Sequence, residues 1–147
     1  LFGSAQGPDE RLEELERIFT GAEVRARLVP DITRRVWDKF AFISTVATAT
    51  SYTDEPYGGV LGNPDYRAQF TALLDEFQAV AKAKGIVLSD GIAAQVVDQM
   101  ERIPTDTTTS MQRDFRAHRS TELESLTGYI VREGKRLDGM YAGLLQR

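Results

Sequence analysis

The chain has 147 residues, with 18 basic and 22 acidic side chains, one histidine, no cysteine and a formal net charge of −4. This length fits one domain with a sizeable core, and the lack of cysteine excludes disulfide frameworks, thiolate metal sites and cysteine nucleophiles. The acidic balance argues against a nucleic-acid or anionic-membrane surface, because both need a basic face. No apolar run reaches the ~18 residues of a membrane span and the amino terminus lacks a signal pattern, so we expect a cytoplasmic location.

The first thirty residues predict one short helix and at most one strand. The segment up to Pro8 suggests no regular structure, and an amphipathic helix then runs from Asp9 to Gly21. Residues 24–28 alternate apolar and charged side chains with the period of a strand. Because no second alternating run follows, we expect this strand only as an edge addition to something outside the chain.

The next part of the chain predicts two long helices. Asp31 is the expected N-cap of a helix that continues to about Ser51. Residues 54–62 are rich in glycine and predict a loop. Asn63 followed by proline is a strong helix start, and Gly85 closes the helix that follows.

The last part of the chain is also helical. A helix is expected from about Asp90 to Pro104, and Thr109 with Gln112 fits a capping box for the next one. Helical periodicity then continues with interruptions near Gly134 and Gly139. Six or seven helices and one doubtful strand give an all-α fold class.

The obvious cofactor motifs are missing. The glycines of residues 58–62 lack the spacing and the strand–turn–helix context of a dinucleotide fingerprint, so we interpret them as a helix connection. His118 has no neighbours with metal-ligand spacing, and we expect no metal site.

Two charged residues fall on apolar helix faces. Lys39 shares its arc with five apolar residues: Ile32, Val36, Phe40, Ile43 and Ala47. Glu122 is followed by apolar residues at i+4, i+7 and i+8. Because burying a single charge is costly, we expect the two groups to lie close together, facing a cavity and within reach of one small substrate. From spacing alone, an ion pair that only fixes packing and a functional pair remain equally open.

Four motifs occur in order between about Asp31 and Gly134: Trp37-Asp38-Lys39-Phe40, residues 74–85, Ser110-Met111-Gln112-Arg113-Asp114, and Thr121-Glu122-Leu123 with Gly128-Tyr129. In order and separation they resemble the carboxy-terminal domain of the ketopantoate reductases. This resemblance implies a helical bundle like the carboxy-terminal domain of 6-phosphogluconate dehydrogenase, preceded in the family by a Rossmann domain. It also implies NADPH-dependent reduction of 2-dehydropantoate to pantoate, a step of pantothenate biosynthesis.

The resemblance further implies roles for individual residues. Lys39 corresponds to the catalytic general acid, Glu122 to its partner and Ser110 to a substrate-binding serine. Ile43 and Ala47 stand at substrate-binding positions where the family usually has asparagine. We therefore interpret the chain as the helical domain of a family member that reduces 2-dehydropantoate. The first alternative is a relative that acts on a different 2-oxo acid.

A helical interaction module that keeps Lys39 and Glu122 only as a structural pair is the second alternative. We expect residues 1–30 to be a remnant of the interdomain connection and residues 31–147 to form the helical substrate-binding and dimerisation domain, with a homodimer as a possible assembly. The Gly-Val-x-Thr-Pro segment usual in the family is missing near Asp138. The NADPH is expected on the Rossmann domain, so the chain by itself should be inactive and bind no dinucleotide tightly.

Overall fold

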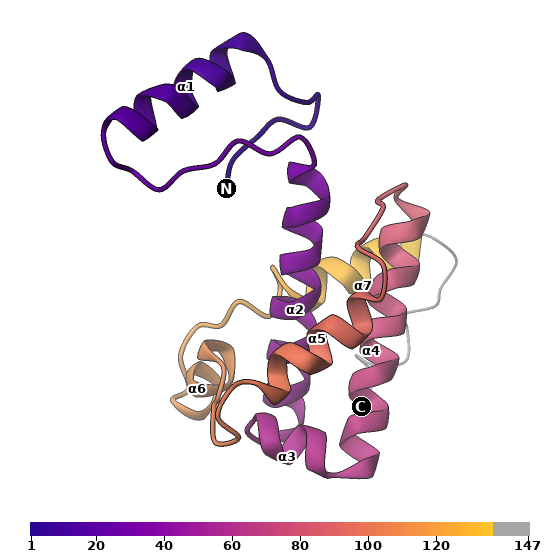
Figure 1. Ribbon diagram of the computed structural model, residues 1–147. Coiled ribbons are helices and arrows are strands. Elements are labelled where there is room, and N and C mark those ends of the chain that lie inside the picture. The colour runs from indigo at the N-terminus through magenta and orange to yellow at the C-terminus, as the bar shows by residue number, and fades with distance from the viewer. Residues whose placement is uncertain (137–147) are drawn as a thin grey trace.

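The computed structural model describes residues 1–136, which fold into seven helices (Figure 1). The helices are α1 (Glu10–Gly21), α2 (Ile32–Thr53), α3 (Tyr57–Gly62), α4 (Pro64–Ala83), α5 (Ile92–Glu101), α6 (Ser110–Arg116) and α7 (Thr127–Arg136). The predicted all-α fold class is confirmed. No helix in this part of the chain is long and apolar enough to cross a membrane.

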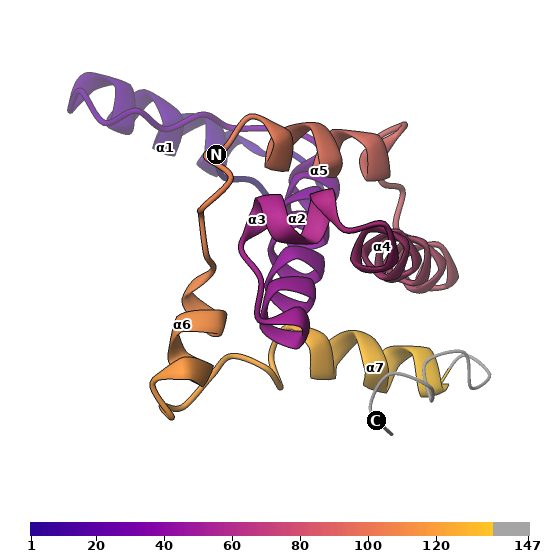
Figure 2. The same cartoon turned by 90° about the horizontal axis from the view of Figure 1, so that it is seen from below.

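Helix α2 is the centre of the bundle, and α3, α4, α5, α6 and α7 all pack against it (Figures 1 and 2). The buried stripe of α4 supplies Phe70 and Phe77, each at most 1% exposed. Trp37 and Phe40 of α2 meet Phe77 and Tyr129 of α7 with ring centroids 5.4 to 6.3 Å apart, mostly edge to face. These aromatic contacts fix α2 between α4 and α7.

Helix ends that depend on local chemistry lie where the sequence predicts them. The Asn63 side chain accepts a hydrogen bond from the Asp65 N–H (2.9 Å) at the start of α4, and Gly85 follows its end with φ +72°. Asp31 precedes α2 as expected, but its carboxylate makes no capping bond. It binds Arg34 and Arg35 of the first turn instead, and the hydrogen bond from Arg34 holds the Asp31 pKa below its ordinary value.

The amino-terminal segment is more ordered than the sequence predicts. Phe2 and Leu28 form a parallel bridge, in which the Phe2 N–H donates to the Arg27 carbonyl and the Val29 N–H donates to the Phe2 carbonyl (both 3.0 Å). Helix α1 connects the two paired segments, lies apart from the bundle and buries none of its own residues (Figure 1). The expectation that residues 1–8 have no regular structure is therefore wrong at Phe2. A bridge that involves a single residue produces no alternating pattern in the sequence, so the sequence could not predict it.

The glycine-rich segment forms a helix instead of the expected loop. Gly58 and Gly59 lie in α3, and the Gly58 N–H donates to the Thr105 carbonyl (2.8 Å). A Cβ at Gly58 would lie 2.7 Å from the Thr105 Cβ, so glycine allows this close approach to the connector before α6. The helix is held by contacts from a distant segment, which local sequence does not reveal.

The region after Thr109 is two helices with an irregular connection. Helix α6 ends at Arg116, and His118 adopts a left-handed conformation with φ 51°. Helix α7 begins only at Thr127 and continues through Gly134, so the interruption predicted at that glycine is wrong. The interruption predicted near Gly139 and the sequence around Asp138 lie outside the described residues.

Candidate functional site

Lys39 lies on a part of α2 that the other described helices do not cover. Its apolar neighbours Val36 and Ile43 are 56% and 38% exposed, and Lys39 is itself exposed. The prediction that this arc is a buried face holds at Phe40, which packs against the core, but it is wrong at Val36, Lys39 and Ile43. The reason is that α4 and α7 pack on the side of Trp37 and Phe40, so that among the described residues the Lys39 side of the helix is left open.

Further along α2 the same side is covered by α6. Thr50 lies eleven residues after Lys39, which is three helical turns and places the two on one stripe. The Thr50 Oγ1 lies 2.9 Å from the Thr109 Oγ1 at the start of α6, and Ala47, one turn earlier, is buried. The structure therefore brings Thr50 and the start of α6 together and buries Ala47 one turn away, while Lys39 and Ile43 are exposed.

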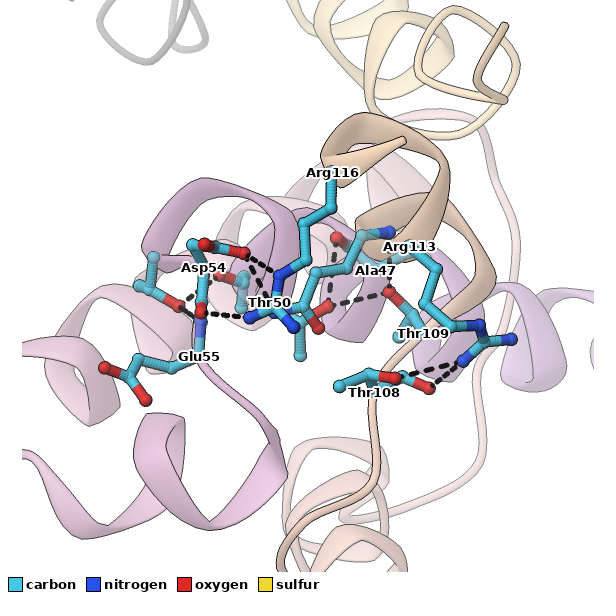
Figure 3. Close-up of polar contacts among 11 residues, drawn as sticks. Ala47, Thr50, Asp54, Glu55, Thr108, Thr109, Arg113 and Arg116 are labelled. Atoms are coloured by element: carbon cyan, nitrogen blue, oxygen red, sulfur yellow. Dashed lines mark hydrogen bonds and ion pairs between the residues drawn. The ribbon is translucent and has the colours of Figure 1, made fainter. Parts of the chain in front are cut away.

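Hydrogen bonds through the hydroxyl groups of Thr109 and Thr50 hold the start of α6 against α2 (Figure 3). Thr109 accepts a hydrogen bond from the Gln112 N–H (3.2 Å) as the N-cap of α6. Thr50 donates its single hydroxyl hydrogen to the Val46 carbonyl (2.9 Å), so the Thr109 hydroxyl must donate to Thr50. Half of the predicted capping box is confirmed, since the Gln112 side chain turns to Asp54 (3.3 Å) instead of the Thr109 backbone.

The other end of α6 is tied to the end of α2. Arg116 donates to the Asp54 side chain (2.6 Å) and to the Asp54 carbonyl (2.8 Å), as Figure 3 shows. Asp54 is the left-handed C-cap of α2, with φ 55°. The Arg116 and Gln112 hydrogen bonds lower the Asp54 pKa below its ordinary value. Both ends of α6 are thus fixed on α2.

Ser110 is the first residue of α6 and is free to face a ligand. Its side chain is exposed, and its hydroxyl makes no hydrogen bond within the described residues. Because Thr109 already supplies the cap, the position of α6 does not require the Ser110 hydroxyl. In the sequence, only the order of Thr109 and Ser110 at the expected helix start indicates which of the two caps the helix.

Glu122 lies in the connection between α6 and α7, in a turn where its carbonyl accepts from the N–H groups of Ser125 and Leu126 (both 3.0 Å). The helical face assumed for Glu122 is therefore wrong, because the chain leaves the helix at His118. Glu122 is exposed and forms no ion pair with Lys39 in the described part of the chain. Both views place this connection on the α6 side of α2 (Figures 1 and 2), and the approach of Glu122 to Lys39 stays a prediction.

Sequence reasoning missed an apolar groove of about 310 Å³ beside α2. Four separate segments of the chain line this groove, so no local sequence pattern predicts it. Its lining consists of Thr48, Ala49, Ser51, Tyr52, Thr53, Tyr66, Gln69, Leu73, Met111, Phe115, Leu123 and Thr127. Neither Lys39 nor Glu122 contributes to it. Among residues 1–136 no cluster of three or more acidic, histidine or cysteine side chains could hold a metal ion.

The fold is shared with a solved structure. A crystal structure of a PanE/ApbA family ketopantoate reductase from Ralstonia eutropha JMP134 has the same fold, with a TM-score of 0.79 over 95% of this chain and 45% of that chain at 24% identity. The helical bundle therefore has the fold of the matching part of that protein.

The family model "Ketopantoate reductase PanE/ApbA C terminal" matches residues 31–141, and the chain belongs to this family. An uncharacterized oxidoreductase YkpB of Bacillus subtilis is 26% identical over 93% of this chain and 46% of its own length. A 2-dehydropantoate 2-reductase of Vibrio cholerae is 29% identical over 91% of this chain and 47% of its own length. The chain thus spans about half the length of the curated relatives it matches.

Proposed function

We propose that this chain is the substrate-binding and catalytic helical domain of an NADPH-dependent reductase of 2-oxo acids. In this proposal Lys39 is the general acid, Glu122 is its partner, and Ser110, Ile43 and Ala47 line the substrate site. The observation that carries the proposal is the exposed lysine on an uncovered stripe of α2, on the side of the helix that meets the start of α6. Family membership supports the assignment.

The chemistry of Lys39 suits this role. Hydride addition to a ketone builds negative charge on the carbonyl oxygen, and a nearby ammonium group both stabilises that charge and donates the proton that completes the alcohol. The exposed apolar neighbours Val36 and Ile43 leave the ammonium group without a competing carboxylate on this face of α2. A covering domain would exclude water from it.

The amino-terminal segment supports one position for the covering domain of this proposal. The two segments that form the isolated parallel bridge are joined by helix α1, which is the usual kind of connection between parallel strands, and parallel strands occur in sheets with helices on their faces. The bridge between Phe2 and Leu28 is followed within a few residues by α2, so it lies at the Lys39 end of that helix (Figure 1). In our proposal a sheet continuing from this bridge places a second domain over the Lys39 stripe.

Within residues 1–136, neither the glycines of α3 nor the start of α1 fits a dinucleotide. Gly58 and Gly59 lie in α3, with Thr105 and Glu55 occupying the space beside them, and so cannot cradle phosphates. The start of α1 carries Asp9 as its cap and two glutamates in its first turn, which repel phosphate. NADPH, which supplies the hydride when bound, therefore belongs in this proposal to the other domain.

The finer identity of the substrate is also part of the proposal. We take 2-dehydropantoate as the first candidate, because the Vibrio cholerae relative carries that name. Apolar Ile43 and Ala47 favour a 2-oxo acid with an apolar side chain as the alternative. The ratio of kcat/KM for 2-dehydropantoate and 4-methyl-2-oxopentanoate decides between them.

The test uses the complete protein with NADPH and a panel of 2-oxo acids, and it follows the loss of NADPH absorbance. We expect Lys39→Met to lower kcat by about 10²–10⁴-fold. Lys82→Met, at an exposed lysine of α4, is the matched control and should keep full activity. Equal activity of the two variants would reject Lys39 as the general acid. If no 2-oxo acid is turned over, an interaction module becomes the better interpretation.

A homodimer is also part of this proposal. Light scattering, which measures the molar mass in solution, tests it.

A further inference from the structure

The groove beside α2 has an aromatic rim. Tyr52 at the end of α2 is 54% exposed and Phe115 of α6 is 41% exposed, and both line the groove together with half-buried Tyr66 of α4. Leu73 of α4 and Met111 of α6 add apolar walls. A hollow of about 310 Å³ with apolar and aromatic walls has the size and the character of a site for a small molecule.

A carboxyl group lies in a smaller hollow that adjoins this groove. Glu76 of α4 is among the residues that line the smaller hollow. The hollow and the groove share Thr48, Leu73 and Thr127. The Glu76 Oε2 is buried and accepts no hydrogen bond from any described residue, and burial raises the Glu76 pKa. Within residues 1–136 no lysine, arginine or histidine lines either hollow, so this carboxyl group faces no cation there.

Two hydroxyl groups beside the carboxyl group can also accept hydrogen bonds. Thr48 donates its single hydroxyl hydrogen to the Ser44 carbonyl (2.7 Å), so Thr127 is the donor in the contact between the Thr48 and Thr127 hydroxyl groups (2.6 Å). The Thr127 Oγ1 itself accepts no hydrogen bond from a described residue. The Ser51 Oγ is buried at the groove, also without a partner in the described part of the chain. Together with the Glu76 Oε2, three oxygen atoms are thus available to a ligand that brings hydrogen-bond donors.

These features select a ligand with a cationic donor group and an apolar body. A primary ammonium group has three N–H donors and carries the positive charge that Glu76 lacks as a partner. Aromatic rings attract cations over their faces and also pack against apolar groups. A carboxylate or phosphate ligand would meet no cation in either hollow and would be repelled by the ionised Glu76 side chain. A 2-oxo acid or a dinucleotide is therefore unsuited to this place.

We propose that the groove and the adjoining hollow form a binding site for a primary amine with an aromatic or other apolar body. The ammonium group donates to the Glu76 and Thr127 side chains, and the body lies against Leu73 and Met111 below the aromatic rim. The site contains none of the residues assigned to the reduction of a 2-oxo acid. This inference goes beyond the proposed function and is independent of it, because binding is measured without a 2-oxo acid or NADPH.

Nuclear magnetic resonance of methionine methyl groups tests the proposal, with 2-phenylethylamine as the probe. Met111 lines the groove, whereas Met100 is buried in the core and does not line it. In the complete protein with ¹³C-labelled methionine methyl groups, we expect a saturable shift of the Met111 signal and an unchanged Met100 signal. Met111→Leu and Met100→Leu identify the two signals. The neutral 2-phenylethanol and the anionic 3-phenylpropionate carry the same ring, and each should bind at least about tenfold more weakly than the amine.

Two substitutions on α4 separate the role of the Glu76 carboxyl group from a general effect of negative charge. Glu76→Gln should remove the preference for the amine over the alcohol, whereas Asp75→Asn, at the exposed neighbouring residue, should keep it. Equal affinities of the amine and the alcohol for the unchanged protein overturn the proposal, and so does a Met111 signal that no probe shifts. An unchanged preference in Glu76→Gln, or an equal loss in both variants, also overturns it. If Glu76→Gln does not fold, the comparison of the three probes on the unchanged protein still decides.

Discussion

Replacing Thr109 by alanine should destabilise the domain, whereas replacing its neighbour Ser110 should not. Thr109 caps α6 through the Gln112 N–H (3.2 Å) and donates to Thr50 (2.9 Å). Loss of an N-cap costs about 1 kcal/mol, and loss of a second hydrogen bond adds up to about 1 kcal/mol. Thr50 still donates to Val46 after the change, so no buried donor is left unpaired. We expect a loss of roughly 1–2 kcal/mol in the free energy of unfolding.

That loss corresponds to a Tm lower by roughly 2–8 °C for a domain of this size. Ser110→Ala removes an exposed hydroxyl that makes no hydrogen bond in the described residues, so its effect should stay within about 0.5 kcal/mol. Thermal unfolding followed by circular dichroism measures both variants. Thr109→Ser keeps the capping oxygen and should recover most of the lost stability.

Activity of the complete protein supplies the second half of this prediction. If Ser110 binds substrate, Ser110→Ala should raise KM for the 2-oxo acid while Tm stays nearly unchanged. Equal losses of Tm for the two alanine variants would refute the assignment of the cap to Thr109. An unaltered KM for Ser110→Ala would remove that residue from the substrate site.

Three further predictions concern the cofactor, a partly buried carboxyl group and a glycine. The chain without a second domain should show no saturable NADPH binding at micromolar concentrations by calorimetry, and a tight one-to-one isotherm would contradict this. Burial raises the Glu76 pKa, so stability should fall as pH rises from the ordinary glutamate value of about 4.3 through the raised value. Glu76→Gln should therefore raise Tm at neutral pH and lose this advantage in acid, and an equal gain at both pH values would exclude titration as its cause. Gly58→Ala should cost about 1–3 kcal/mol by overpacking against Thr105, while Gly62→Ala in the same helix meets nothing within 4 Å and should be tolerated in the same urea titration.

The sequence predicts best the features that a few neighbouring residues determine. Asn63 and Thr109 accept the hydrogen bonds that begin α4 and α6, and Gly85 follows α4 with a positive φ. Each of these needs only a side-chain oxygen or a missing Cβ at the right position. Such signals do not depend on the rest of the fold.

The errors arise where a distant segment decides the structure. Helix α3 forms in a glycine-rich stretch because residues 105 and 107 accept hydrogen bonds from its first turn. The segment with Glu122 reads as a helix by its spacing, but the left-handed His118 ends α6 before it. Periodicity also cannot tell which apolar stripe of α2 is covered, since that depends on where α4 and α7 pack.

The two halves of α2 place the candidate residues in different situations. Hydrogen bonds between threonine hydroxyl groups fix the second half of α2 to α6 and α7. The Thr50 hydroxyl pairs with that of Thr109, and the Thr127 Oγ1 lies 2.6 Å from the Thr48 Oγ1. Ser110 therefore keeps its position whatever covers the rest of the molecule. The first half carries Lys39 on a stripe that the other described helices leave open, and in our proposal a second domain covers this stripe. Substitutions at α6 are thus informative in this chain alone, whereas the proposed role of Lys39 is tested by the activity of the complete protein.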